Sequence, residues 1–308
     1  MKIALKVDAD TLRGTRYGVP RLVEILKARD ASATFLFSLG PDHTGRAVTR
    51  VFRRGFVRKV RRTSVISHYG LKTLLYGTLL PGPDIGRECA EVMRNVRDAG
   101  FEVGIHAWDH VLWQDNVARA NVRWTLEQMA FAQNRFREIF GTNARVHGAA
   151  GWQMNAHAWG LASRFGFEFC SDTRGNSPFM PVNLAEAPAC PQLPTTLPTL
   201  DEMLGVDGAI ADDVVNRLLE HTRQWAPYGH VFTLHAELEG MKLSPLFAQL
   251  LDGWREQGHE LVSLGEYLGA LRIDALPHHE IKYAEIPGRS GTVAMQGRKI
   301  ESPSTREI

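Results

Sequence analysis

Short apolar runs alternate with longer amphipathic segments along most of this chain, and this alternation limits the fold more than any other feature. The runs that predict β-strands are 3–7, 33–38, 101–105, 144–148, 167–171, 230–235 and 259–262. The segments that predict helices are 19–29, 86–99, 117–140, 155–165, 211–225 and 244–257. Strands and helices in succession predict an α/β fold with a largely parallel sheet, closed or nearly closed into a barrel.

Residue types that bind metals directly follow three of these predicted strands. They are Asp8 and Asp10, His106 and His110, and His235. The carboxyl ends of parallel barrel strands meet at one rim, where the active sites of such folds are built. Carboxylate oxygens and imidazole nitrogens together suit a divalent metal that keeps open positions. The pattern therefore predicts an enzyme with a metal site at this rim.

The spacing within each pair supports this prediction. Asp8 and Asp10 are two residues apart, so both carboxylates face one side if the strand continues through them. One can then ligate a metal while the other acts as a base. His106 and His110 have the i, i+4 spacing that places two imidazoles on one face of a helical turn. The alternatives are an aspartate that caps a turn and two histidines in an ordinary loop.

Two further polar residues end predicted strands. His147 is equally consistent with a buried structural histidine and with a functional one. Asp172 can either orient a histidine or bind a substrate.

The composition is that of a globular protein. The chain has 308 residues, 44% hydrophobic and 23% charged, which is enough for one large core or two smaller ones. Its three cysteines lack CxxC spacing, which favours a reducing compartment. We find no signal-peptide pattern and no apolar run of about 18 residues, so we expect a cytoplasmic protein, soluble or peripheral to a membrane.

One segment, from residue 43 to residue 83, interrupts the alternation. It has nine basic residues and no acidic one, and Phe52, Phe56 and Val60 recur among the cations at helical spacing. A basic amphipathic helix followed by a leucine-rich stretch is typical of an element that binds an anionic membrane surface, here through residues 46–80. A helical hairpin packed on the barrel is the alternative. No nucleic-acid-binding motif accompanies the charge, so we expect no nucleic-acid partner.

The order of the motifs resembles a known family. Asp8-Ala-Asp10, His106-x3-His110 and Leu234-His235 are similar to the motifs of the polysaccharide deacetylase (NodB-like) family, metal-dependent carbohydrate deacylases with a distorted (β/α) barrel. The resemblance implies that Asp8 is the catalytic base and His235 the catalytic acid. It also implies that Asp10, His106 and His110 hold the divalent metal, with zinc, cobalt, nickel and manganese all suitable.

Longer strings resemble one branch of that family, the deformylases of a lipid-linked amino sugar. Among them are Ala149-Ala-Gly-Trp152 and His235-Ala-Glu-Leu-Glu-Gly240. This resemblance implies removal of formate from undecaprenyl phosphate 4-deoxy-4-formamido-L-arabinose, a step of lipid A modification and polymyxin resistance, at the cytoplasmic face of the inner membrane. The expected substrate-binding residues are Arg13, Arg16, Trp152, Asp172 and Arg174.

The chain departs from the general family in two ways. The adjacent Asp-Asp of the family is Asp8-Ala-Asp10 here, and the arginine that positions the family's base has no match around 146–151. Arg174 and Asp172 are the candidates to replace that arginine. A deacetylase of a soluble N-acetylated oligosaccharide and a non-catalytic lipid-binding barrel are the alternative functions. We expect one barrel domain over 1–272, with 43–83 as an insertion, and a loosely packed polar tail over 273–308.

Overall fold

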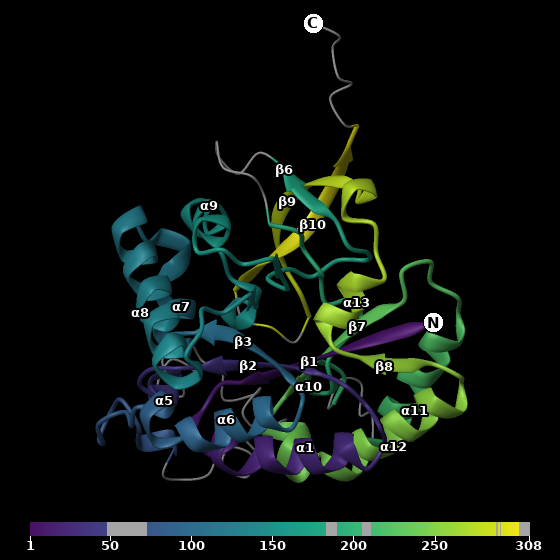
Figure 1. Cartoon of the computed structure of the whole chain (residues 1–308), viewed down its shortest axis with the longest axis horizontal. Helices are drawn as coiled ribbons and strands as arrows, with labels where there is room; N and C mark the ends of the chain where they lie inside the picture. Colours follow the sequence, from purple (N-terminus) through teal and green to yellow (C-terminus); the bar gives the residue numbers. More distant parts are fainter. Residues whose placement is uncertain (48–72, 183–189, 205–210, 288, 290, 302–308) are drawn as a thin grey trace, which may run out of the picture.

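The computed structural model describes residues 1–47, 73–182, 190–204, 211–287, 289 and 291–301. Its main sheet has seven strands in the order β5-β4-β3-β2-β1-β7, with β8 paired to β1, and each pairing within it is parallel (Figure 1). The strands are β1 Lys2–Ala9, β2 Thr34–Ser38, β3 Glu102–Ala107, β4 Val146–His147, β5 Phe169–Cys170, β7 His230–His235 and β8 Glu260–Val262. The predicted α/β class and parallel sheet are confirmed.

Strand β1 pairs with three strands of this sheet, β2, β7 and β8, and is buried on both faces. Ile3, Leu5 and Val7 belong to the large hydrophobic core, whereas Ala4 belongs to a smaller cluster that includes Leu36 of β2. Successive side chains of a strand point to opposite faces, so the even-numbered residues of β1 point toward the side of this smaller cluster. Asp8 therefore lies on the same side as Ala4, at the carboxyl end of the strand.

Helices cover the sheet. Figure 1 shows α1, α6, α11 and α12 in one layer, whereas α8 contacts β3 and α9. The helices are α1 Val19–Lys27, α5 Ile85–Glu88, α6 Ala90–Asp98, α7 His110–Asn116, α8 Val122–Phe140, α9 Ala156–Arg164, α10 Leu200–Met203, α11 Ala211–Arg223, α12 Ser244–Glu256 and α13 Leu264–Gly269. Helix α8 begins after Asn121, whose side chain accepts from the Trp124 N–H, and ends at Gly141 in the left-handed conformation.

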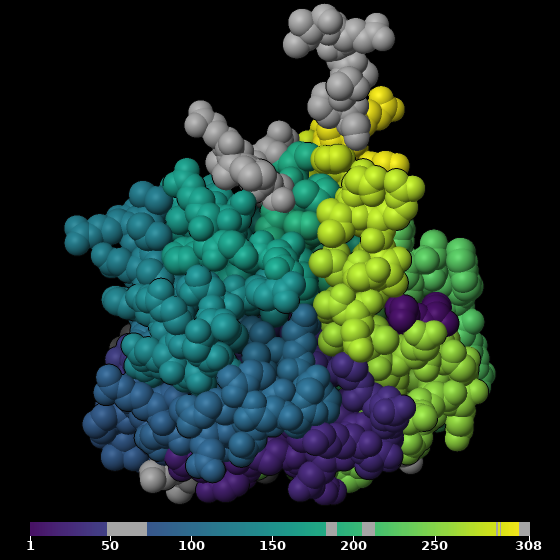
Figure 2. Space-filling model, viewed as in Figure 1, coloured from purple at the N-terminus to yellow at the C-terminus, as the bar shows by residue number. Residues whose placement is uncertain are grey.

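The C-terminal segment differs from its prediction. A loosely packed tail was expected from residue 273, but β9 (His278–Glu285) and β10 (Thr292–Ile300) form an antiparallel pair, and β6 (Met180–Val182) joins β9. Val293 and Ala294 are buried, and the Arg174 N–H donates to the Ala294 carbonyl at 2.9 Å. Figure 2 shows this yellow segment against the teal part of the chain. The low apolar content was misleading because main-chain hydrogen bonds hold these strands.

Residues 48–72 of the predicted membrane-binding segment lie outside the described residues. The two ends of the segment are described. At the first end His43 pairs with Asp109, and at the second the Pro83 carbonyl accepts a hydrogen bond from the Asp42 N–H at 2.9 Å. None of the helices in the described ranges has the length and hydropathy needed to cross a membrane.

Candidate active site

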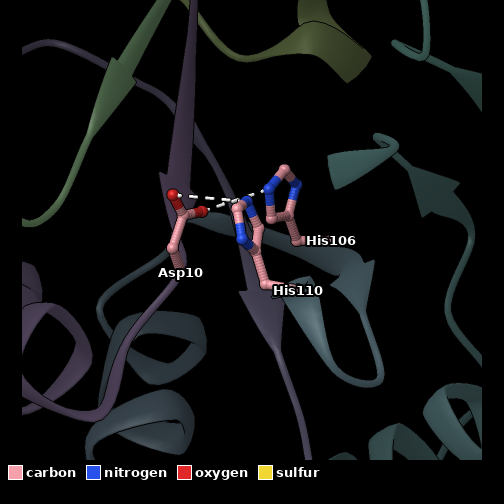
Figure 3. A group of neighbouring side chains, drawn as sticks. All are labelled: Asp10, His106 and His110. Carbon is pink, nitrogen blue, oxygen red and sulfur yellow. Dashed lines mark ion pairs between the residues drawn. The ribbon is translucent and has the colours of Figure 1, made fainter. Parts of the chain in front are cut away.

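Three side chains converge at the carboxyl edge of the sheet. Asp10 follows β1, His106 belongs to β3, and His110 is the first residue of α7 (Figure 3). His106 Nε2 lies 3.1 Å from Asp10 Oδ1, and His110 Nε2 lies 3.5 Å from Asp10 Oδ2. One possible ligand atom from each residue lies within 4.8 Å of the others. At this spacing one cation can contact all three residues.

The two histidines converge by a different route from the one predicted. They were expected on one helical turn, but His106 is still in the strand and the helix begins only at His110. The Asp109 side chain caps that helix by accepting from the Leu112 N–H at 2.9 Å. The chain therefore turns sharply after the strand, and the two imidazole rings stack with their centroids 5.3 Å apart.

The hydrogen bonds of His106 leave its second nitrogen facing a carboxylate. Its Nδ1 lies 2.7 Å from the Gly148 carbonyl oxygen, which can only accept, so Nδ1 carries a proton. Nε2 then needs either a second proton or a cation in order to face Asp10. Burial disfavours the charged ring, yet the negative charges of Asp8 and Asp10 raise the pKa of His106. Burial lowers the pKa of His110.

Asp10 is held as a carboxylate. Burial alone would raise its pKa, but the nearby His110 and His106 hold the pKa of Asp10 well below its ordinary value. One carboxylate and two imidazoles form a donor set that fits a divalent cation, because each can offer a lone pair to it.

Glu237 fixes the loop that carries Asp10. Its Oε1 accepts from the Asp10 N–H at 3.0 Å, the Thr11 N–H at 2.8 Å and the Thr11 hydroxyl at 2.8 Å. A Cβ on Gly14 would lie 2.0 Å from the same oxygen, so only glycine fits there. Burial and the negative charge of Asp10 raise the pKa of Glu237 well above its ordinary value.

Asp8 and His235 face each other across neighbouring strands, because they pair in register between β1 and β7. Asp8 is 3% exposed, and its Oδ1 lies 3.6 Å from His106 Nδ1. Its Oδ2 lies 3.2 Å from the Nζ of Lys6, a fully buried lysine. The carboxylate is thus placed beside the three converging residues without being one of them.

His235 has carboxylates on two sides. Its Nδ1 lies 3.8 Å from Asp201 Oδ1, and its backbone N–H donates to Glu239 Oε2 at 2.7 Å. Burial raises the pKa of Glu239 to about 7. Burial would also raise the pKa of Asp201, but the charges of Arg289 and His235 lower it. Asp201 is therefore an ionised carboxylate close to His235 Nδ1, which has no hydrogen-bond partner among the described residues.

A family model described as polysaccharide deacetylase matches residues 2–170, which include Asp8, Asp10, His106 and His110. The chain belongs to the polysaccharide deacetylase family. It is accordingly a hydrolase that acts on an amide bond.

Two curated relatives match nearly the whole chain. Both carry the name "Probable 4-deoxy-4-formamido-L-arabinose-phosphoundecaprenol deformylase ArnD". The protein from Shewanella sediminis is 38% identical over 97% of this chain and 96% of its own length. The protein from Wigglesworthia glossinidia brevipalpis is 30% identical over 94% of this chain and 100% of its own length.

Solved structures of low sequence identity share the fold. A Mycobacterium smegmatis protein described as a polysaccharide deacetylase superposes with a TM-score of 0.61 at 14% identity, covering 92% of this chain and 94% of its own. Puue allantoinase gives a TM-score of 0.58 at 16% identity, covering 86% of this chain and 88% of its own. These likenesses agree with the barrel-type fold predicted for this family.

The predicted substrate-binding residues have different environments. Arg13 is partly buried and lies immediately before the π-helical turn Gly14–Gly18, and Arg16 pairs with Glu88 at 2.6 Å. Trp152 is 1% exposed, with its ring among three cations. Their contact with a substrate stays a prediction.

Neither candidate to replace the family's arginine pairs with Asp8. Arg174 pairs with Glu202 at 2.6 Å, and Asp172 accepts from His147 Nδ1 at 2.7 Å and from the Ala149 N–H at 2.8 Å. The described cation beside Asp8 is Lys6.

Sequence reasoning missed three residues of the site: Lys6, Asp201 and Glu237. A signal was present for each. Lys6 interrupts an otherwise apolar strand two residues before Asp8, and Glu237 follows His235 by two residues. Asp201 lies within the capping box formed by Thr199 and Glu202, which marks the start of a helix.

Proposed function

We propose that the protein is a metal-dependent deformylase that removes the N-formyl group from undecaprenyl phosphate 4-deoxy-4-formamido-L-arabinose. The free amino sugar would serve lipid A modification and polymyxin resistance. The observation that carries the proposal is the convergence of Asp10, His106 and His110 beside Asp8 and His235. The substrate is inferred from the names of the two relatives that match nearly the whole chain, both named as this deformylase.

Asp10, His106 and His110 would hold the divalent cation. The fit rests on their chemistry, since the ionised Asp10 and the Nε2 of His106 face each other at 3.1 Å and a cation can bind both. When bound, the cation supplies Lewis-acid chemistry: it polarises the formyl carbonyl and lowers the pKa of water. Zinc, cobalt, nickel and manganese all suit this donor set.

The other residues would move protons. Asp8, whose Oδ1 is not hydrogen-bonded to any described residue, takes a proton from the attacking water. His235 protonates the sugar nitrogen as the C–N bond breaks, because an amine is a poor leaving group as an anion. Asp201 orients the His235 ring and stabilises it when it is charged. Formate and a free amine are the products.

We further propose that the protein works at the cytoplasmic face of the inner membrane. The support is the position of the described ends of the basic segment, which contact each other and the loop before His110. The Gly45 N–H donates to the Tyr76 carbonyl at 3.0 Å, and His43 pairs with Asp109, the residue before the ligand His110. The cations of this segment other than Arg46 lie outside the described residues, and each cation near anionic lipid can contribute about 1 kcal/mol of binding.

The activity is tested by formate release from the synthetic formamido-arabinose lipid. We expect release by the purified enzyme, loss after chelation, and recovery when a divalent metal is restored. The N-acetyl analogue is compared in parallel. Acetate release with no formate release would contradict the deformylase proposal. Undiminished activity in metal-free protein would contradict the proposed dependence on a metal.

Membrane binding is tested by flotation with liposomes. The wild-type protein should float with anionic vesicles and not with neutral ones, and deletion of residues 46–80 should remove the difference. A double variant of exposed arginines elsewhere, Arg272→Gln with Arg298→Gln, is the charge control and should float like wild type. Equal recovery of all proteins with both lipids rules out the membrane role.

A further inference from the structure

Lys6 is a lysine buried inside the barrel. It is fully buried, and it lies on β1 between Ala4 and Asp8, on the side of the smaller hydrophobic cluster that includes Leu36. A buried ammonium is costly unless an opposite charge compensates it. Among the described residues, the carboxylate that pairs with Lys6 is Asp8, with Nζ 3.2 Å from Oδ2. Because it is buried, Lys6 contacts Asp8 and not the solvent.

The pair leaves one oxygen of Asp8 available. Lys6 lies beside Oδ2, whereas Oδ1 is directed toward the His106 side of the site, 3.6 Å from His106 Nδ1. That Nδ1 donates to the Gly148 carbonyl instead. The positive charge of Lys6 therefore lies on the Oδ2 side of Asp8, and Oδ1 has no hydrogen-bond partner among the described residues.

The indole of Trp152 fixes the position of Lys6. Lys6 Nζ lies 5.2 Å from the ring centroid, within the range of a cation–π contact. Trp152 has a φ of 53°, rare for a residue with a side chain, and its Nε1 donates to Thr195 Oγ1 at 3.1 Å. On the other side, a Cβ on Gly148 would lie 2.9 Å from Lys6 Cε, so glycine there leaves room for the lysine.

The same indole also contacts the opposite side of the site. Arg289 Cζ lies 4.9 Å from the ring centroid, and its guanidinium pairs with Asp201 at 3.2 Å, the carboxylate beside His235. Arg289 comes from the turn between β9 and β10, in the segment that was expected to be a loose tail. The buried ring of Trp152 thus contacts two cations. Lys6 lies next to the proposed base Asp8, and Arg289 pairs with Asp201, which lies beside the proposed acid His235.

We propose that Lys6, seated on Trp152, is the positioning residue that orients Asp8 as the base. The inference rests on the proposed function, in which Asp8 takes the proton from water. Lys6 thereby takes the place that neither Arg174 nor Asp172 fills.

The test replaces Lys6 with methionine, which keeps the length of the side chain and removes the charge. We expect kcat to fall about a hundredfold, within the range of general-base contributions, and KM to stay within about twofold of wild type. Bound metal and the absorption spectrum of the cobalt-substituted protein should be unchanged. Lys6→Arg should restore kcat to within about tenfold of wild type, because the positive charge returns. Lys2→Met, a partly exposed lysine of the same strand, is the matched control and should behave like wild type.

A crystal structure of Lys6→Met should show the Asp8 carboxylate rotated from its wild-type position, and this readout does not depend on the substrate. Wild-type kcat in Lys6→Met, loss of its metal, or no recovery in Lys6→Arg would each overturn the inference. If Lys6→Met fails to fold, Lys6→Gln replaces it, with the same expected fall in kcat at constant KM; wild-type kcat there is equally decisive. Failure of the wild-type protein to release formate would instead count against the proposed function alone.

Discussion

Two clusters of histidine and aspartate lie on neighbouring strands, and they differ in how their polar atoms are paired. Asp10, His106 and His110 form one, and His147, Cys170 and Asp172 form the other. Both have ligand-type atoms within 4.8 Å of one another. Composition and spacing alone would therefore assign a metal to each.

In the second cluster, donors already meet acceptors. Asp172 Oδ1 accepts from His147 Nδ1 at 2.7 Å and from the Ala149 N–H at 2.8 Å, and Cys170 Sγ lies 3.3 Å from Cys190 Sγ. All members of this cluster are buried. It needs no cation, because its hydrogen bonds are internal.

In the first cluster, a carboxylate faces a histidine nitrogen that has a proton only if the ring is charged. The carboxylate of Asp10 faces the Nε2 atoms of both histidines, and the remaining nitrogen of His106 is occupied by the Gly148 carbonyl. The pairing of the polar atoms, rather than the residue types, therefore distinguishes a candidate metal site from a buried hydrogen-bond network.

The largest expected effect is on metal content. His106→Ala should lose the bound metal and reduce formate release by about a thousandfold or more, since several kcal/mol of catalysis are lost at about 1.4 kcal/mol per factor of ten. His147→Gln is the matched variant in the second cluster and should keep the metal of the wild type. Elemental analysis of the purified proteins measures both. Metal retained in His106→Ala, or lost in His147→Gln, would break the distinction between the clusters.

The next effect separates holding a metal from moving a proton. His235→Ala should lower kcat by about a hundredfold to ten-thousandfold, the usual contribution of a general acid, with no loss of metal. Asp201→Asn should lower kcat less, because His235 remains present but loses its ionised partner, 3.8 Å away. Steady-state kinetics and metal analysis of the same preparations measure kcat and metal content for both variants. A metal-depleted His235→Ala would make His235 a ligand instead of an acid.

The sequence was sufficient to predict the strands that carry the first cluster. The apolar runs before Asp8, His106 and His235 are β1, β3 and β7, because periodic burial is a local property of the chain. Parallel strands then bring their carboxyl ends together, so convergence of these side chains followed from topology.

The side chains that pair with the site residues could not be predicted in the same way. Glu237 holds the backbone of Asp10 from a position 227 residues away in sequence, and Arg289 reaches Asp201 from a segment judged too polar to pack. Such pairings depend on tertiary contacts that no local pattern records. For the same reason, the sequence led us to Arg174 and Asp172, and not to Lys6, as candidate neighbours of Asp8.

A smaller effect is expected on stability in the second cluster. Asp172→Asn removes a buried charged acceptor of two hydrogen bonds, so the free energy of unfolding should fall by about 2–3 kcal/mol. Asp252→Asn, which removes an exposed ion pair with Arg29, is the control and should cost about 1 kcal/mol or less. Urea denaturation of both proteins, with metal analysis, measures the difference. A stable Asp172→Asn that had lost its metal would mean that the two clusters share a function.

The smallest effect is expected at the third member of the second cluster. Cys170 is completely buried and its thiol lies against Cys190, and burial raises its pKa well above the ordinary value, which keeps it a neutral thiol. A neutral thiol packs as a small apolar group and is a poor metal ligand. Cys170→Ala should therefore cost about 1 kcal/mol of unfolding free energy and leave metal content and kcat unchanged. A fall in metal content would instead show that the second cluster binds a cation despite its satisfied hydrogen bonds.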